Sequence, residues 1–187
     1  MLQTQGDLVS KLLGLLKEAV PGLSRLAVLW NPTVKSKQRD WQEARAAAPK
    51  LGIALASYEV GAPADLDGAF TAIKQNRPDA LVVFGDPLVV RLRKRITAFA
   101  SSERLPAIYP QRQFADAGGL MSYSADLNDL FRRAARIVDK VLKGEKPADI
   151  PVEQPTKFEF VINMKAASTL GLALPPNFIA GADEVIE

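Results

Sequence analysis

The stretch Ala80-Leu81-Val82-Val83-Phe84-Gly85-Asp86-Pro87 decides the fold of this chain. Its first five residues are apolar and rich in β-branched side chains, and Gly-Asp-Pro ends the run. A short apolar run between turn signals is typical of a strand covered on both faces, as in parallel sheets. The sequence therefore predicts a central buried strand, with a helix beginning near Leu88 after it. Ligands of open α/β sheets bind outside the carboxyl ends of the strands, so Asp86 stands at an expected binding crevice.

Helices and strands alternate on both sides of this central strand. The apolar runs predict strands at 26–30, 53–60, 80–84, 106–109 and 120–123. Amphipathic spacing predicts helices at 8–20, 36–51, 65–76, 88–102 and 111–117. Such alternation implies right-handed crossovers and helices on both faces of a parallel sheet. We predict an α/β fold with a doubly wound parallel sheet of about five strands in the order 2-1-3-4-5, flanked by helices.

The pattern changes after Ser124. Residues 126–143 form the longest amphipathic segment, and a connector with three prolines follows at 147–157. A final strand at 158–162, a short helix at 164–170 and a proline-bearing tail complete the chain. The apolar stripe of the long helix comprises Leu127, Leu130, Phe131, Ala134, Val138, Val141 and Leu142. Because an exposed apolar face of this length is a liability, we expect this stripe to be buried. Another copy of the chain is the favoured cover, and a neighbouring face of its own sheet is the alternative.

Composition limits the possible functions. The 187 residues are 48% hydrophobic and 24% charged, with neither Cys nor His. Disulfides, thiolate catalysis and the commonest metal ligands are therefore excluded, and we predict no metal site and no cofactor. No apolar run is long enough to span a membrane, and the N-terminus lacks the pattern of a signal peptide.

The charge of the chain does not favour a nucleic-acid partner. The net charge is +3, and the basic residues gather at 91–95 and 132–143. Both clusters lie on predicted helices whose opposite faces are apolar, so solvated outer faces explain them better than phosphate contacts.

Several phrases of the sequence together resemble one protein family. They are LLKEAVPGLSRLAVLWNP, GDPLV, the run from LPAIYPQRQFADAGGLMSYSADLNDL to INMKAASTLGL, and ADEVIE. Their order and spacing resemble the substrate-binding proteins of ABC transporters, in the branch that includes aromatic amino-acid binders. The resemblance covers nearly the whole chain from about residue 8, and 105–172 is its most specific part.

The resemblance implies one lobe of a type I periplasmic-binding protein. Members are longer, with a signal or lipoprotein segment and a first lobe ahead of the helix that begins here near Leu8. By resemblance, 1–124 and 147–187 form the second lobe, and 125–146 is a crossing helix that would cover the missing first lobe. The implied partners are a small-molecule solute, ABC permease subunits, and either the missing first lobe or a second copy of the chain. The implied location is the periplasm or the cell envelope, although this chain shows no signal peptide.

The candidate ligand-binding residues lie at the ends of the expected strands. Strand order reverses between the first and third strands, which sets Asn31 and Pro32 beside Asp86 and Pro87 at the crevice. By resemblance, the acidic residue after the third strand meets the α-amino group of the ligand, in a charge-assisted bond. Asp86 is equally a favourable cap for the next helix, and one oxygen can cap while the other faces the crevice. Asn31 either caps the segment after it or donates to a ligand carboxylate.

The remaining candidates lie farther along the same rim. Tyr109 and Gln111 end the fourth strand, where an aromatic ring either stacks on a solute or packs into the core. Ser122, Tyr123 and Ser124 stand at the expected hinge, where by resemblance relatives have both a cleft contact and a crossover.

These features favour a solute-binding component of an ABC importer that binds an amino-acid-like molecule without chemistry. A small α/β enzyme is disfavoured, because the chain has no glycine-rich phosphate loop and no nucleophile elbow. A cytoplasmic effector-sensing domain on the same fold is the remaining alternative.

Overall fold

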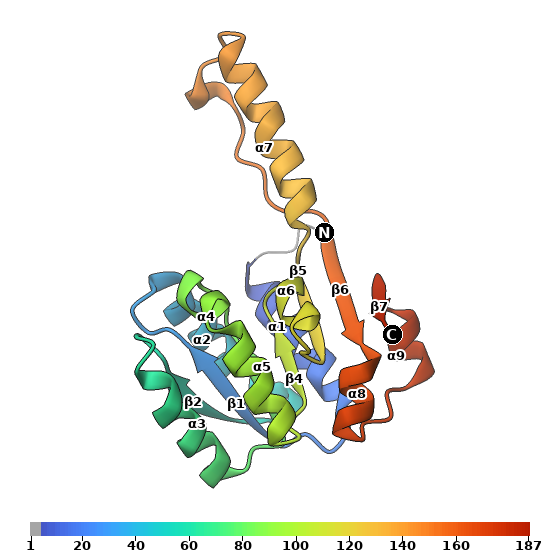
Figure 1. Cartoon of the computed structure of the whole chain (residues 1–187). Helices are drawn as coiled ribbons and strands as arrows, with labels where there is room; N and C mark the ends of the chain where they lie inside the picture. The colour runs from blue at the N-terminus through green and yellow to red at the C-terminus, as the bar shows by residue number, and fades with distance from the viewer. Residues whose placement is uncertain (1–4) are drawn as a thin grey trace.

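The computed structural model describes residues 5–187, and in it seven strands form one sheet in the order β2-β1-β3-β4-β5-β6-β7 (Figure 1). The strands are β1 (Arg25–Trp30), β2 (Ala54–Glu59), β3 (Ala80–Val83), β4 (Ala107–Tyr109), β5 (Met121–Ala125), β6 (Phe158–Asn163) and β7 (Glu184–Ile186). The helices are α1 (Gln5–Ala19), α2 (Lys35–Ala47), α3 (Asp65–Asn76), α4 (Pro87–Arg91), α5 (Arg93–Ser102), α6 (Arg112–Asp116), α7 (Leu127–Leu142), α8 (Met164–Leu170) and α9 (Pro176–Ala180). The first four residues of the expected lobe lie outside the described part.

The first five strands confirm the predicted order and direction. β1 pairs in parallel with both β2 and β3, and β3, β4 and β5 continue in parallel. All four residues of β3 are buried, as its unbroken apolar run predicts. The central strand therefore lies inside the sheet, covered on both faces.

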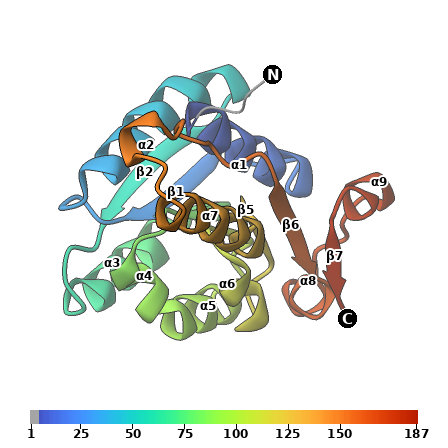
Figure 2. The same ribbon diagram turned by 90° about the horizontal axis from the view of Figure 1, so that it is seen from above.

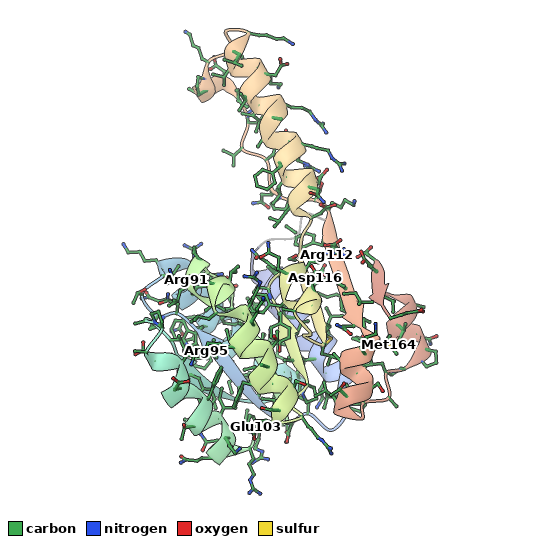
Figure 3. All side chains as sticks on the ribbon, viewed as in Figure 1. Arg91, Arg95, Glu103, Arg112, Asp116 and Met164 are labelled. Carbon is green, nitrogen blue, oxygen red and sulfur yellow. The ribbon has the colours of Figure 1, made fainter. Side chains whose placement is uncertain are left out.

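Two helical layers cover the sheet (Figure 2). α1 and α2 pack on one face, where Leu13 and Leu16 meet Val28 and Val82 in one apolar cluster. α3, α4, α5 and α6 cover the other face in a second cluster. The basic cluster at 91–95 lies on this second layer, and Arg91 and Arg95 are on its exposed surface (Figure 3), as the sequence predicts.

The structure corrects the predicted elements at three places. The expected helix at 88–102 is divided into α4 and α5 at Leu92, whose ψ of 2° lies outside the helical range. β6 pairs antiparallel with β5, so the sheet is not wholly parallel. β7 lies in the expected tail and pairs with β6, which makes seven strands instead of about five.

An arginine ties the added strands to the lobe. The guanidinium of Arg112 on α6 pairs in a bidentate manner with Glu184 of β7. The same group lies 3.4 Å from Glu159 of β6 and 3.6 Å from Asp116 (Figure 3). Three carboxylates from separate elements thus converge on one cation and fix the edge of the sheet.

The helix α7 rises away from the lobe instead of packing on it (Figure 1). None of its side chains is buried against the described part of the chain. Phe131 is 72% exposed and Leu142 is 81% exposed. The stripe is therefore not buried on a neighbouring face of its own sheet, and its burial against another copy of the chain stays a prediction.

The excursion that carries α7 leaves and re-enters the sheet at one place. Ala125 at the end of β5 is paired with Phe158 at the start of β6. Asp126 donates its backbone N–H to the carbonyl of Lys157 at 3.0 Å, and their side chains form an ion pair at 2.8 Å. Residues 126–157 are thus inserted between two neighbouring antiparallel strands.

Candidate functional site

The carboxyl ends of the parallel strands form the edge of the lobe from which α7 rises (Figure 1). The register pairs Leu29 with Val83, so the segments that begin at Asn31 and Gly85 emerge side by side. This is the edge at which open α/β sheets bind ligands.

A pocket of about 210 Å³ opens at this edge. Its walls come from α1, α2, the ends of β3, β4 and β5, and the first residue of α7. Most of the lining is apolar, and the polar side chains are few. The lining residues are Leu8, Val9, Leu12, Lys37, Asp40, Val83, Phe84, Gly85, Pro110, Gln111, Tyr123, Ser124, Ala125 and Leu127.

A close approach between strands shapes the floor of the pocket. A Cβ atom at Gly85 would lie 2.6 Å from Cβ of Pro110, closer than carbon atoms pack. Only glycine therefore allows the segments after β3 and β4 to come together here. This contact explains the glycine that ends the central strand.

Asp86 caps a helix with one oxygen and leaves the other unpaired. Its Oδ1 accepts hydrogen bonds from the backbone N–H groups of Leu88 at 2.6 Å and Val89 at 3.1 Å. Its Oδ2 is buried and has no hydrogen-bond partner in the described chain. The capping interpretation is confirmed. Asp86 does not line the pocket itself, although Gly85 beside it does.

Asn31 also makes a local cap. Its Oδ1 accepts from the backbone N–H of Thr33 at 3.0 Å and from the Thr33 hydroxyl at 2.7 Å. The residue is 5% exposed. Pro32 is half-buried and its carbonyl accepts a hydrogen bond from Gln38, while Pro87 is exposed as the first residue of α4.

Tyr109 lies in the core. Its ring stacks on Phe114 with centroids 5.0 Å apart, and the residue is 1% exposed. Complete burial raises the pKa of the Tyr109 hydroxyl well above its usual value. The Tyr109 ring therefore packs into the core, which is one of the two interpretations that the sequence allows.

The sequence candidates that line the pocket are Gln111, Tyr123 and Ser124. Gln111 is half-buried just ahead of α6, and its side chain makes no capping hydrogen bond. Tyr123 stacks on Phe158 with centroids 5.6 Å apart. Ser122 beside it is 1% exposed, and its Oγ has no partner among the described residues.

The sequence interpretation missed two charged residues of the pocket, Lys37 and Asp40 on α2. The Lys37 ammonium donates to Oδ2 of Asp40, and their side chains are 16% and 7% exposed. Glu43 lies one turn farther along α2. Its burial is the main cause that raises the pKa of its carboxyl group, and the charge of Asp40 is the next. The available signal was the three-residue spacing of opposite charges, but it does not tell which face of α2 turns inward.

The family model for ABC transporter substrate binding proteins matches residues 5–186. The chain belongs to this family. No curated protein gives a significant match. Within the described part of the chain, no helix is long and apolar enough to cross a membrane, and no three potential metal ligands gather.

Solved structures share the fold. A conserved domain protein from Vibrio cholerae aligns with a TM-score of 0.88 at 24% identity, over 95% of this chain and 60% of its own. A Streptococcus pneumonia ABC domain in complex with L-Trp aligns equally well, at 25% identity and with the same coverage. A ligand-free, open substrate-binding protein from Clostridium difficile aligns with a TM-score of 0.72 at 20% identity, over 96% of this chain and 59% of its own. The chain thus spans about 60% of the length of these structures, which is consistent with one lobe of a type I periplasmic-binding fold.

Proposed function

We propose that this chain is the solute-binding component of an ABC importer and holds an amino-acid-like molecule without chemical change. The observation that carries the proposal is the apolar pocket at the carboxyl edge, ringed by a few polar groups and open beside α7. The proposed partners are the permease subunits of the importer. The proposed location is the periplasm or the cell envelope.

The size of the pocket supports a site that another lobe completes. Sites that enclose a small ligand usually measure roughly 300–1,000 Å³. The pocket here is about 210 Å³ and open to one side. We propose that 1–124 and 147–187 form one lobe, and that the helix in 125–146 packs against the other. The exposed apolar stripe of α7 supports this arrangement, because such a face is stable only when covered.

The polar groups at the edge suggest how a ligand is held. The unpaired Oδ2 of Asp86 is suited to an α-ammonium group, since a charge-assisted hydrogen bond is stronger than a neutral one. Asn31 with Pro32, and Pro87 beside Asp86, shape the approach to that carboxylate. Gln111 and Tyr123 contact the solute from the pocket wall. Tyr109 and Ser122 support the strand ends from inside the core.

The experiment is a titration of the isotopically labelled chain, followed by amide NMR. At 20.3 kDa the chain gives resolved spectra, and NMR detects the millimolar affinity expected of an incomplete site. L-tryptophan, L-phenylalanine and L-leucine are the probes, and indole-3-propionate is the matched control without an ammonium group. We expect shifts confined to the pocket walls and the ends of β3 to β5, weaker for the control.

Two results would contradict the proposal. One is the absence of any saturable shift with all three amino acids at several millimolar. The other is the appearance of new ligand signals over hours, which would indicate turnover instead of binding.

A further inference from the structure

A groove of about 410 Å³ lies beside the carboxyl-edge pocket, on the face of the sheet that α1 covers. Residues of α1 and α9 form its walls, and β5 and β6 form its floor. The two helices lie on either side of β6 (Figure 2). Its volume is within the range of roughly 300–1,000 Å³ that is usual for small-molecule sites. Tyr123 lines both the groove and the pocket, so the two hollows share one wall.

The groove is open because the connection between its two floor strands leads away from the sheet. Helices normally cover the faces of an α/β sheet. Here the segment 126–157 joins β5 to β6 and carries α7 away from the lobe (Figure 1). None of the side chains of α7 is buried against the described part of the chain. The face of the β5–β6 pair between α1 and α9 is therefore accessible to a ligand.

Aromatic rings from three elements form the apolar surface of the groove. Tyr123 pairs with Phe160 across the ladder, and Phe158 precedes Phe160 by two residues, so the three side chains share one face. Phe178 of α9 packs edge-on against Phe160, with ring centroids 5.4 Å apart. Phe160 and Phe178 are buried, whereas Tyr123 and Phe158 are half-buried. Since aromatic rings attract one another in offset and edge-to-face arrangements, this surface suits a ligand with a flat ring.

The charged residues of the groove favour a cation. Glu18 and Asp183 contribute two carboxylates, and Lys11 contributes the one ammonium group among the lining residues. Oδ2 of Asp183 accepts a hydrogen bond from the backbone N–H of Phe160 at 2.8 Å. This bond fixes an exposed carboxylate at the border of the aromatic surface. A protonated amine is the matching donor, because hydrogen bonds between charged groups are stronger than neutral ones.

We propose that the groove is a second binding site, for a small molecule that joins an aromatic ring to a protonated amine. The ring packs on Tyr123 and Phe158, and the ammonium group donates to Asp183. Glu18 adds a second negative charge from the wall of α1. The site is separate from the proposed solute pocket, so this inference does not rest on the proposed function.

The test compares ligands that differ only in the amine. The probes are tryptamine with tryptophol, and phenethylamine with 2-phenylethanol, each titrated into the full chain by amide NMR. We expect saturable shifts at Glu18, Phe178 and Gly181, which exceed those at Gly85 and Gln111 in the carboxyl-edge pocket. Each amine should bind about two- to fivefold more tightly than its alcohol, the range of an exposed ion pair. This comparison uses the unaltered chain and does not depend on any variant folding.

Three variants then locate the preference for the amine. Asp183→Asn keeps a side-chain oxygen for the N–H of Phe160 but removes the charge, and Glu18→Gln removes the other carboxylate. We expect the first to bind tryptamine and tryptophol alike, and the second to reduce the preference. Asp65→Asn is the matched control, because Asp65 is also an exposed carboxylate that accepts from backbone N–H groups. It precedes the opposite edge of the sheet from Asp183 and should keep the full preference.

Four results would overturn the inference. They are the absence of saturable shifts in the groove at several millimolar tryptamine, equal affinities for amine and alcohol in the unaltered chain, and a preference that survives in Asp183→Asn. The fourth is a change of the groove signals on dilution of the chain alone, which would show that a second copy of the chain fills the groove. None of these results bears on amino-acid binding at the carboxyl edge, which the signals of Gly85 and Gln111 report separately.

Discussion

The two carboxylate oxygens of Asp86 have different surroundings. One oxygen caps α4 and the other has no partner in the described chain. Asp86→Asn keeps a side-chain oxygen for the cap but removes the negative charge. We expect it to weaken binding of an amino acid by roughly 1.5–3 kcal/mol, the value of a hydrogen bond to a charged group, with little change in the melting temperature. Amide NMR titration of the wild-type chain and the variant measures the affinity.

The control for this prediction is Asp65→Asn. Asp65 is an exposed carboxylate whose oxygen accepts from the backbone of Gly61 at 2.9 Å and Ala62 at 2.8 Å. The substitution removes the same charge and should leave the affinity unchanged. Equal affinity of the wild-type and Asp86→Asn chains would mean that Asp86 is a cap and nothing more.

Asp79 stabilises the start of the sheet. Its Oδ2 accepts from the backbone N–H of Ser24 at 2.9 Å, the Ser24 hydroxyl at 2.9 Å and the backbone N–H of Arg25 at 2.7 Å. We predict that Asp79→Ala lowers the free energy of unfolding by roughly 1–3 kcal/mol, because two backbone donors lose their acceptor. Urea denaturation of the wild-type chain and the variant measures this free energy. Ser24→Ala, which removes only the hydroxyl, should cost clearly less, and equal losses would contradict the argument.

The same carboxylate should make stability depend on pH. Burial raises the pKa of Asp79, but the hydrogen bonds from Ser24 and Arg25 outweigh it and the pKa is lowered. A carboxylate with a lower pKa in the folded state stabilises the fold fully above its unfolded value of about 4, and this contribution is lost as the pH falls through the folded value. The stability difference between the wild-type chain and Asp79→Ala should therefore shrink below about pH 4. A constant difference between pH 7 and pH 3 would contradict this assignment.

At the scale of residues, sequence reasoning located polar groups at strand ends and missed those on a helix. Asn31 and Asp86 are predictable because the carboxyl end of a strand has a fixed place in the fold. Lys37 and Asp40 are not, because charged residues on a helix usually face solvent. These two are turned inward by the packing of α1 against α2, a tertiary contact that no local pattern encodes.

Among the helices and strands, α7 differs in that its apolar face is not packed against the described part of the chain. Its exposed apolar residues include Phe131 and Val138, with 72% and 56% of their surfaces accessible. We predict that this chain alone self-associates through α7, and that Phe131→Glu abolishes the association without lowering the melting temperature, because the ring has no packing to lose. Light scattering across a dilution series measures the molar mass.

The matched control is Lys140→Gln on the opposite face of α7, which changes the net charge by the same amount. It should leave the association intact. A monomer at every concentration of the wild-type chain would refute self-association.

Elements with a clear apolar run or helical periodicity were predictable, and features that depend on distant contacts were not. The apolar run of β3 and the periodicity of α7 each extend far enough to identify the element. β7 has three residues and depends on β6 and on Arg112, which lies far away in the sequence. No glycine or proline lies near Leu92 to indicate the break between α4 and α5. The prediction of a single helix there was therefore wrong.

For the molecule as a whole, the excursion 126–157 is separable from the fold. Its ends adjoin the paired residues Ala125 and Phe158, and none of the side chains of α7 is buried against the described part of the chain. We predict that replacing 126–157 by a two-residue Asn-Gly turn, the connection that antiparallel neighbours favour, leaves a folded lobe with a nearly unchanged melting temperature. Circular dichroism and amide NMR measure this. A molten or aggregated product would show that the excursion stabilises the lobe.

The pairing of Ala125 with Phe158 also has a mechanical consequence. A force applied to α7 is transmitted to the lobe by β5 and β6 together. It acts in the same direction on both strands, because the excursion joins their adjacent ends. Because the two strands are loaded alike, the hydrogen bonds between them do not slide past one another. The load passes instead to the parallel ladder between β4 and β5, which is formed by only two residue pairs. A protein or domain that binds α7 is therefore mechanically coupled to the strand ends that form the pocket.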